Sequence, residues 1–338
     1  MINIDGSMGG GQILRTALGL SAYTKKPFSI INIRAGRKEP GLKEQHLQAV
    51  NAMAKLCNAD VSGNELHSKE VIFTPREIAK KELNIKISTA GSVGLVLQAL
   101  MMPAIKENLN VTIEGGADFG KFAPPTLHIK HVLIPLLEKM NCSANINIKR
   151  YGFYPKGGSC AEFFSNKSKL MPLNILETGD IISIEGVSVA SSSLKNARVA
   201  ERQANAAKQI LFKKFAAIPN IKTIYDNSIC TGSGIQLWIK TKNSFIGANA
   251  LGEPGKKSEV VGEEAANELI FEYENGCVDQ HTADQLIPYM ALANNSKILT
   301  SKITEHTKTN IEIVKKFLDV DFEIKGQIIS NSILIRQL

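Results

Sequence analysis

The sequence predicts an α/β (α+β) protein made of three repeated α/β units with a small inserted α/β domain. First, residues 42–61, 125–146 and 305–324 each place apolar side chains at helical spacing, followed by a turn and a β-rich stretch. Second, another helix pattern and a strand pattern precede each segment, so that every unit reads helix, strand, helix, strand, strand. Third, an additional α/β pattern long enough to fold alone stands before the last unit.

Each of the three units is expected to contain the same helices and strands. Their first helices and following strands are expected at 10–23 and 28–36, at 91–105 and 110–118, and at 282–293 and 297–304. Each second helix carries an apolar stripe, which is typical of a core face packed against a sheet. The stripe residues are Leu47, Val50, Met53 and Cys57 in the first unit, Val132, Leu136 and Met140 in the second, and Ile313, Val314 and Phe317 in the third.

The insertion is measured by the spacing of the repeats. Lys55, Lys139 and Lys316 end the second helices, and they are separated by 84 and 177 residues. The expected strands of the insertion lie at 181–190, 220–226 and 234–242, and its expected helices at 199–215 and 259–273. We therefore expect residues 1–178 and 275–338 to form a large domain and residues 179–274 to form the inserted one.

Composition excludes several classes of protein. Of the 338 residues, 43% are hydrophobic and 21% are charged, which is ordinary for a globular protein and argues against disorder. The longest apolar stretch, residues 91–105, is interrupted by Gln98 and Pro103 and is shorter than the roughly 20 residues that span a bilayer. The first residues lack a basic region followed by an apolar run, which a secretory signal requires. We expect a cytoplasmic protein without a membrane partner.

Charge and cysteine content bear on partners and cofactors. The 40 Lys and Arg residues exceed the 32 Asp and Glu residues, giving a net charge of +8. This excess favours an anionic partner such as nucleic acid or nucleotide phosphate, although a solvated lysine surface explains it as well. The five cysteines form no C-x-x-C pair, so free thiols are expected instead of a disulfide framework or a zinc knuckle.

A glycine-rich turn is the strongest local motif. Gly9, Gly10 and Gly11 follow a short strand and open a helix, where backbone N–H groups and the helix dipole favour an anion. Arg15, one turn into the helix, is placed to add a charge-assisted hydrogen bond. A simple strand-to-helix turn explains the glycines equally well. The motif is not a Walker loop, because G-x-x-x-x-G-K-[ST] occurs nowhere.

A basic turn precedes the second helix of the first unit. Arg34 and Arg37 lie three residues apart at a strand-to-helix junction, which suits bidentate contacts with phosphate. Gln45 and His46 follow at the helix start. A solvated basic turn remains the alternative interpretation.

The third unit supplies two further candidates. The segment from His281 to Gln285 opens its first helix, where capping explains Asp284 as well as a functional role does. His306 opens its second helix just after a strand, where a side chain can project into a cleft, although a structural histidine is also consistent with that place. His128 and His131 form only a weak i, i+3 pair on a helix expected at the surface, and they do not indicate zinc.

Seven blocks in order along nearly the whole chain resemble the RNA 3′-terminal phosphate cyclase family. They are GGGQILRTA, IRAGRKEPGLKEQH, GSVGLVLQ, GGADFGKFAPPT, YGFYPKGG, TADQLIPYMALA and EHTKTNIEIVKKF. The family has three repeats that resemble the C-terminal domain of translation initiation factor three, and a small inserted domain where the spacing indicates one here. The resemblance thus agrees with the repeat found independently.

The resemblance implies an ATP-dependent ligase that converts an RNA 3′-phosphate into a 2′,3′-cyclic phosphate and releases AMP and pyrophosphate. His306 matches the family's histidine nucleophile, which carries AMP covalently before AMP passes to the RNA. The matching ATP-binding positions are Gln98, His281, Thr282, Ala283, Asp284 and Gln285. The matching positions for phosphate and RNA are Arg15, Arg34, Arg37, Gln45 and His46. ATP and a divalent metal, Mg or Mn, are the implied cofactors, RNA is the implied partner, and a homodimer is left open.

The chain departs from the family at the glycine loop. The family has G-E-G-G-G-Q with a glutamate that helps to hold the metal, whereas the sequence from Ser7 to Gln12 reads S-M-G-G-G-Q, two residues shorter and without the acid. The metal is then expected to be held chiefly by phosphate oxygens and water, or adenylylation is impaired. The sequence identifies no metal ligands of its own.

Three other functions compete with the cyclase. A non-catalytic cyclase-like RNA-binding protein in ribosomal RNA processing shares the fold, but such relatives lack the nucleophilic histidine that matches His306. An enolpyruvyl transferase also stacks related α/β repeats, but six of them, which 338 residues barely supply. A plain RNA-binding module is the third alternative.

Overall fold

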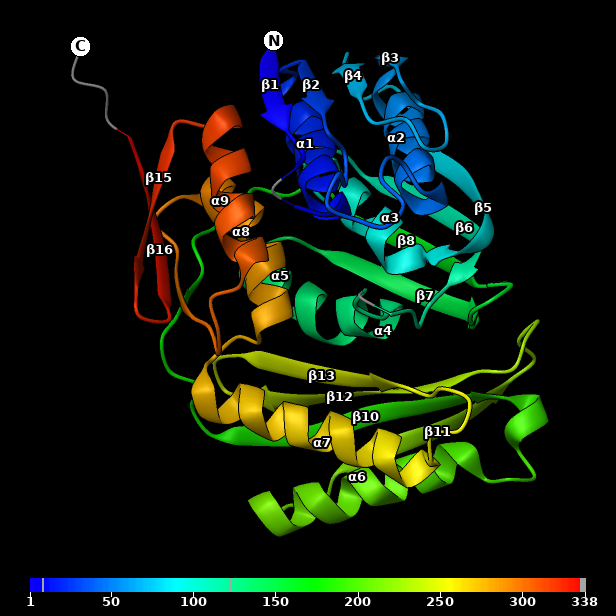
Figure 1. Ribbon diagram of the computed structural model, residues 1–338. Coiled ribbons are helices and arrows are strands. Elements are labelled where there is room, and N and C mark those ends of the chain that lie inside the picture. The colour runs from blue at the N-terminus through cyan, green and yellow to red at the C-terminus, as the bar shows by residue number, and fades with distance from the viewer. Residues whose placement is uncertain (8, 122, 335–338) are drawn as a thin grey trace.

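The computed structural model describes residues 1–7, 9–121 and 123–334 (Figure 1). In these residues the strands form four separate four-stranded sheets, and helices pack on them. This arrangement confirms the predicted α/β class. None of the described helices is both long and apolar enough to cross a membrane.

The first unit occupies residues 2–74. Its elements are β1 (Ile2–Asp5), α1 (Gly11–Thr24), β2 (Phe28–Ile31), α2 (Glu44–Cys57), β3 (Asp60–Ser62) and β4 (Val71–Thr74). The strand order is β1-β2-β4-β3, in which β1 and β2 are parallel and the other two pairs are antiparallel. A parallel pair needs a crossover connection, and α1 provides it.

The second unit repeats this topology. Its elements are β5 (Glu82–Ser92), α3 (Val93–Met101), the 3-10 turn η1 (Pro103–Ile105), β6 (Leu109–Ala117), α4 (Thr126–His128), the π-helical turn η2 (Ile129–Leu133), α5 (Ile134–Lys139), β7 (Ala144–Arg150) and β8 (Cys160–Ser165). The order is β5-β6-β8-β7, again with one parallel pair and two antiparallel pairs.

The third unit has the same strand order but is split along the chain. Its elements are β9 (Asn174–Ile175), α8 (Gln280–Ala293), β14 (Lys297–Leu299), α9 (Glu305–Phe317), β15 (Val320–Lys325) and β16 (Ile328–Ile333). The order β9-β14-β16-β15 matches the other two sheets, with β9 parallel to β14. The extra residues therefore interrupt the third unit after its first strand, whereas the repeat spacing had placed them between units.

The inserted segment forms the fourth sheet. Its elements are β10 (Ile181–Ser191), the 3-10 turn η3 (Ser192–Leu194), α6 (Val199–Phe215), β11 (Asn220–Asp226), β12 (Ser233–Thr241), β13 (Phe245–Leu251) and α7 (Ser258–Asn275). The order is β11-β10-β12-β13, and α6 and α7 cover the face turned away from the rest of the chain (Figure 1). The sequence pattern does not predict β13, because the glycine, alanines and asparagine of this strand have low β propensity.

Buried side chains confirm most of the predicted core. Val50, Leu136 and Phe317, one from each stripe, are fully buried in the cluster that joins the three units. The inserted segment has its own apolar cluster, and all five cysteines are free thiols, as expected. The expectation that His128 and His131 lie on a surface helix was wrong. His128 is fully buried, and the His131 ring stacks on the Trp238 ring at 4.1 Å between centroids, because the inserted sheet packs against this helix.

Candidate active site

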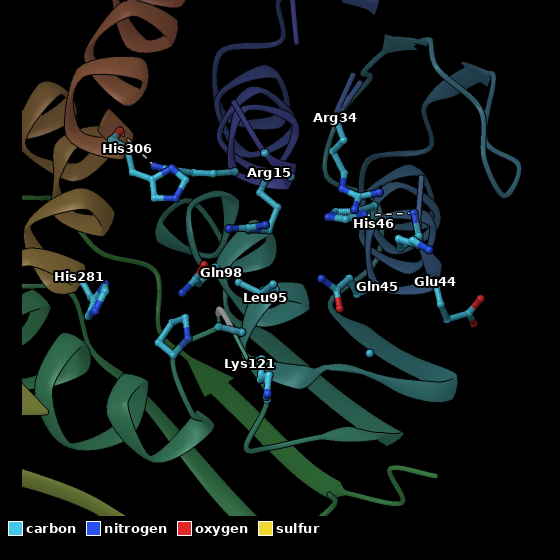
Figure 2. A pocket seen from close by; sticks show the side chains of 18 of the residues that line it. Arg15, Arg34, Glu44, Gln45, His46, Leu95, Gln98, Lys121, His281 and His306 are labelled. Carbon is cyan, nitrogen blue, oxygen red and sulfur yellow. Dashed lines mark hydrogen bonds between the residues drawn. The ribbon is translucent and has the colours of Figure 1, made fainter. Parts of the chain in front are cut away.

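The three units, together with residues 249–253 of the inserted segment, line a cleft of about 1290 Å³. Figure 2 shows His281 and His306 on one side of this space and Arg34 and His46 on the other, with Arg15 between them. Ten of the twelve predicted site residues line the cleft: Arg15, Arg34, Arg37, Gln45, His46, Gln98, His281, Asp284, Gln285 and His306. Thr282 and Ala283 are fully buried and lie behind its wall.

Arg15 is a partly buried cation without a counter-ion. It lies on the first turn of α1, beside the glycine loop, and it has no hydrogen bond or ion pair with any residue that the structure describes. Burial lowers the pKa of its guanidinium to about 10, so the group stays charged near neutral pH. A cation that is desolvated and unpaired favours an anion at this position. Met8, in the same loop, lies outside the described residues.

His46 presents a fixed neutral ring to the glycine loop. The backbone N–H of Lys43 donates to His46 Nδ1 at 3.1 Å, which places the ring proton on Nε2. A Cβ on Gly11 would lie 1.9 Å from Nε2, so only glycine permits this close approach. Burial, followed by the charges of Arg15 and Arg34, lowers the pKa of His46 to about 3. The ring therefore acts as a hydrogen-bond donor and not as a cation.

The two arginines of the basic turn differ in their contacts. Arg34 Nη1 donates to the carbonyl oxygens of Glu39 at 2.9 Å and Gly41 at 2.7 Å, and thus closes the turn itself. Arg37 is exposed and has no partner in the described part of the chain, and its Nη2 lies 3.5 Å from the position that a Cβ on Gly10 would occupy. Arg37 is thus the guanidinium of this turn that is free to meet an anion above the glycine loop.

Amide side chains connect the second and third units across the cleft. Gln98 Nε2 on α3 donates to Gln285 Oε1 on α8 at 2.8 Å. Gln285 Nε2 in turn donates to the carbonyl oxygen of His281 at 3.0 Å. On the other side, the backbone N–H of Ser92 donates to Gln45 Oε1 at 3.0 Å. These contacts bring residues from distant blocks of the sequence into the two sides of one cleft.

His306 is exposed at the start of α9 and faces the cleft. Partial desolvation, followed by the positive charges of Arg15 and Arg37, lowers the pKa of its imidazole below the ordinary value. The ring is therefore neutral near pH 7 and keeps a lone pair for a nucleophilic attack. Gln12 Nε2 donates to the carbonyl oxygen of His306 at 3.3 Å, a contact that the sequence analysis did not anticipate.

Asp284 fixes the start of the helix that carries His306. Its Oδ1 accepts hydrogen bonds from Thr304 Oγ1 at 2.7 Å and Thr307 Oγ1 at 2.6 Å. Burial raises the pKa of Asp284 to about 6, and the two threonines oppose that rise. Asp284 does not cap its own helix, because the α8 cap is Asp279, which accepts from the backbone N–H of Thr282 at 2.9 Å.

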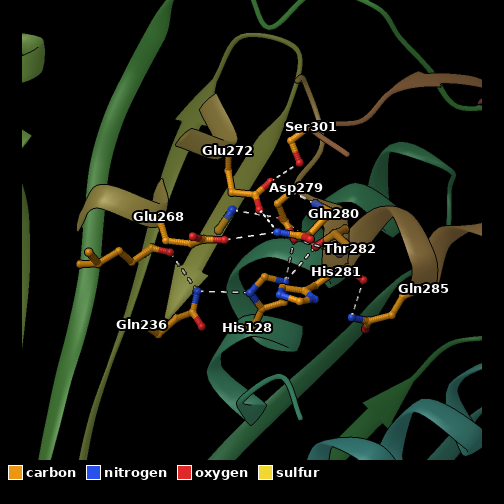
Figure 3. Close-up of polar contacts among 12 residues, drawn as sticks. His128, Gln236, Glu268, Glu272, Asp279, Gln280, His281, Thr282, Gln285 and Ser301 are labelled. Carbon is orange, nitrogen blue, oxygen red and sulfur yellow. Dashed lines mark hydrogen bonds and ion pairs between the residues drawn. The ribbon is translucent and has the colours of Figure 1, made fainter. Parts of the chain in front are cut away.

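A buried polar network holds α8 from behind, as Figure 3 shows. Thr282 Oγ1 donates to Asp279 Oδ2 at 2.8 Å and lies 2.8 Å from His128 Nε2. Gln236 of β12 reaches His128 Nδ1 at 3.3 Å. Glu272 of α7 accepts from the backbone N–H of Gln280 at 3.1 Å, and its pKa is raised by burial and by the Asp279 carboxylate. The inserted segment thus supports the α8 wall of the cleft.

The described residues form no metal site of their own. Among the described residues, no group of three or more His, Cys, Asp or Glu side chains is arranged to hold a metal ion. The cleft carboxylates are already engaged: Glu39 pairs with Lys43, Glu44 accepts from Ser88, Glu253 pairs with Lys121, and Asp284 accepts from two threonines. The residues present therefore do not fit a metal held by the protein alone.

Comparisons with known proteins agree on one family. The model of the family described as RNA 3′-terminal phosphate cyclase matches residues 7–324. A protein of that name from Pyrococcus abyssi (strain GE5 / Orsay) is 43% identical over 334 residues, covering 97% of this chain and 96% of the relative. Proteins of the same name from Sulfurisphaera tokodaii and Saccharolobus solfataricus are each 42% identical, covering 97% of both chains. The chain belongs to the RNA 3′-terminal phosphate cyclase family.

Proposed function

We propose that this chain is an ATP-dependent RNA 3′-terminal phosphate cyclase, which converts an RNA 3′-phosphate into a 2′,3′-cyclic phosphate and releases AMP and pyrophosphate. Family membership supports the reaction class. The observation that carries the proposal is the exposed His306 imidazole, whose lowered pKa keeps it neutral, in the same cleft as the unpaired Arg15 cation.

The first step is transfer of AMP to His306. An imidazole nitrogen attacks the α-phosphorus of ATP, a P–N bond forms, the bond from the α-phosphorus to the bridging oxygen breaks, and pyrophosphate leaves. The ring releases its N–H proton to water and becomes a reactive phosphoramidate. Arg15 and Arg37 lie where their charges stabilise the negative charge that develops on the phosphates.

The next two steps take place on RNA. An oxygen of the RNA 3′-phosphate attacks the phosphorus of the adenylylated His306, the P–N bond breaks, and an RNA-adenylate forms. The neighbouring 2′-hydroxyl then attacks the RNA phosphorus, loses its proton and expels AMP, which closes the cyclic phosphate. This last step is intramolecular, so the fixed proximity of the two groups accelerates it.

We assign the two sides of the cleft to the two substrates. Gln98, His281 and Gln285 contact the adenosine part of ATP, while Asp284 holds the start of α9, and Thr282 and Ala283 support the wall from behind. The RNA phosphate lies near Gln45 and His46, next to the turn that Arg34 closes. Mg or Mn would be held chiefly by phosphate oxygens and water and would supply positive charge to the phosphates, since the described carboxylates of the cleft are engaged elsewhere.

We also propose that residues 1–178 with 275–338 form the large domain and that residues 179–274 form the inserted one.

A phosphatase assay tests the function. An oligonucleotide labelled at its 3′-phosphate is incubated with the protein, ATP and Mg²⁺, and then treated with phosphatase. We expect the label to become resistant to phosphatase, because the cyclic phosphate is a diester without a free terminal monoester. An oligonucleotide with a 3′-hydroxyl should remain unchanged. Release of all label by phosphatase, after incubation with folded protein that binds ATP, would contradict the cyclase function.

The pH dependence of AMP transfer tests the state of His306. Because the pKa of His306 is lowered, the reactive neutral form persists below the ordinary histidine pKa of about 6.5. The midpoint of the acid limb of single-turnover labelling should therefore lie below that value. Asp284→Asn removes a carboxyl group of the cleft whose pKa is raised to about 6, and it should leave this acid limb in place. A limb centred above pH 6.5 would contradict the assignment.

The missing loop glutamate favours one second candidate, a non-catalytic cyclase-like RNA-binding protein that acts in ribosomal RNA processing. This candidate predicts that the protein binds RNA but forms no covalent AMP adduct at any metal concentration. Labelling with α-labelled ATP at rising Mg²⁺ and Mn²⁺ concentrations separates the two functions, because a metal held by phosphate oxygens is weakly retained and needs more free ion.

A further inference from the structure

Tyr154 is a large aromatic side chain left in the open at the cleft. It is 77% exposed, although it lines the same space as His306 and Arg37. Its neighbour Pro155 also lines the cleft. Exposure of this size leaves most of the ring's apolar surface in water, which costs free energy unless a partner covers the ring.

The loop that carries Tyr154 is firmly anchored. Phe153 is buried, and its ring stacks on that of Phe119 at 6.0 Å between centroids. The carbonyl oxygen of Phe153 accepts from the backbone N–H of Gly157 at 2.7 Å and from Cys230 Sγ at 2.9 Å. The structure thus presents the Tyr154 ring from a fixed backbone, so little conformational entropy is lost when a partner binds.

The loop lies on the side of the cleft that we assign to RNA. A Cβ on Gly157 would lie 2.9 Å from the carbonyl oxygen of Thr89, a residue of the cleft wall. The same wall segment contains Gly91, where a Cβ would lie 3.2 Å from Cβ of Gln45. Contacts between neighbouring segments therefore connect the Tyr154 loop to the Gln45 side of the cleft.

Two lysine side chains lie on or near the segment that carries the Tyr154 ring. Lys156, two residues along the loop, is exposed and has no ion pair in the described parts of the chain. Lys121, at the same cleft, is only partly neutralised by a salt bridge with Glu253 at 2.9 Å, because both side chains are solvated. An exposed aromatic ring beside an unpaired lysine is the combination that binds single-stranded nucleic acid, through base stacking and phosphate contacts.

We propose that Tyr154 is a stacking platform for a base near the 3′ end of single-stranded RNA, and that Lys156 contacts a backbone phosphate next to it. This inference rests on the proposed function for the choice of RNA as the ligand. Stacking accepts any base, so Tyr154 contributes affinity and register and does not impose a sequence preference. It would hold the last nucleotides while their terminal phosphate lies at Gln45 and His46.

Direct binding without ATP tests the platform. Single-stranded RNA with a 3′-phosphate carries 2-aminopurine at one of its last three positions, and fluorescence quenching and the Kd are measured. We expect strong quenching at one position in the unaltered protein. Tyr154→Ala should abolish that quenching and raise Kd about tenfold or more, whereas Tyr154→Phe should retain both. Lys156→Ala should reduce the salt dependence of Kd by roughly one phosphate contact.

Phe212→Ala is the matched control, because Phe212 is 54% exposed on α6 of the inserted segment and outside the cleft. It should leave quenching and Kd unchanged. Thermal unfolding of Tyr154→Ala and Phe212→Ala should agree, since both remove exposed rings. Absence of position-specific quenching, absence of RNA binding, or equal Kd values for the two variants would overturn the platform. If RNA binding depends on Tyr154 but no cyclic product forms, the stacking platform is supported and the proposed catalytic function is wrong. If cyclic product forms and Tyr154→Ala has no effect on RNA binding, the catalytic function is supported and the platform is wrong.

Discussion

His306→Ala should abolish covalent transfer of AMP to the protein, with a loss of three orders of magnitude or more, about what removing a nucleophile costs. We assign His281, the other exposed histidine on that side, to the adenosine part of ATP. The buried His46 accepts a hydrogen bond at Nδ1 from the backbone N–H of Lys43, so its ring has no free lone pair. The measurement is retention of label from α-labelled ATP on a denaturing gel, which reports the covalent adduct and nothing bound reversibly.

His67→Asn is the control for this experiment. His67 is also an exposed histidine at the cleft, but it lies in the loop that packs against the basic turn. Its φ of 65° lies in the left-handed region, which asparagine adopts readily, so the substitution should preserve the backbone. This variant should retain label. Label kept by His306→Ala, or lost equally from both variants, would remove His306 from the reaction.

The repeat could be predicted from sequence because its signal is long and periodic. Val50, Leu136 and Phe317 recur at matching places in helices that must each bury one face, and all three are buried. The short strands gave no such signal. β9 has only two residues, Asn174 and Ile175, and takes part in its sheet through its pairing with β14. The sequence therefore placed the insertion one strand too early in the repeat.

The candidate site could be predicted as a set of residues but not as a set of roles. Arg34 and Arg37 look equivalent in sequence, yet one guanidinium binds the carbonyls of its own turn and the other is free. Asp284 matched a helix cap as well as an ATP-binding position, but Asp279 caps α8 and the Asp284 carboxylate holds the start of α9. These differences depend on which backbone groups the fold leaves without partners, and no local pattern records that.

Gln12 illustrates a role that only the structure exposes. Its Nε2 binds the carbonyl oxygen of His306, while its Oε1 is buried and has no hydrogen-bond partner among the described residues. A buried acceptor without a partner is costly, so the amide holds the backbone of His306 at a price in stability. Gln12 lies in the glycine motif, whose pattern predicts an anion site at the helix start. That pattern does not predict a contact with His306, which is 294 residues away in the sequence.

Arg15→Met should lower AMP transfer by about 10²–10³-fold, the usual loss when one preorganised group facing a developing negative charge is removed. The same change should leave the free energy of unfolding unchanged or slightly increased. A structural arginine would behave in the opposite way, because removing it would break ion pairs or hydrogen bonds, and Arg15 has none in the described chain. Burial already lowers its pKa to about 10, so the folded protein bears a cost for this charge.

A second readout separates this role from a general loss of fit. Arg15 is one of the charges that lower the pKa of His306, so its removal should move the acid limb of AMP transfer to higher pH, toward the ordinary histidine value. Arg15→Lys should restore part of both the rate and the limb, since it returns a positive charge without the planar fork. Arg202→Met is the control, because it removes an arginine whose partners, Glu259 and the carbonyl oxygen of Ala197, lie on the inserted segment and outside the cleft. If Arg15→Met transfers AMP at the normal rate and with an unshifted acid limb, Arg15 and His306 do not contact the same anion. The two halves of the candidate site would then have to bind separate ligands.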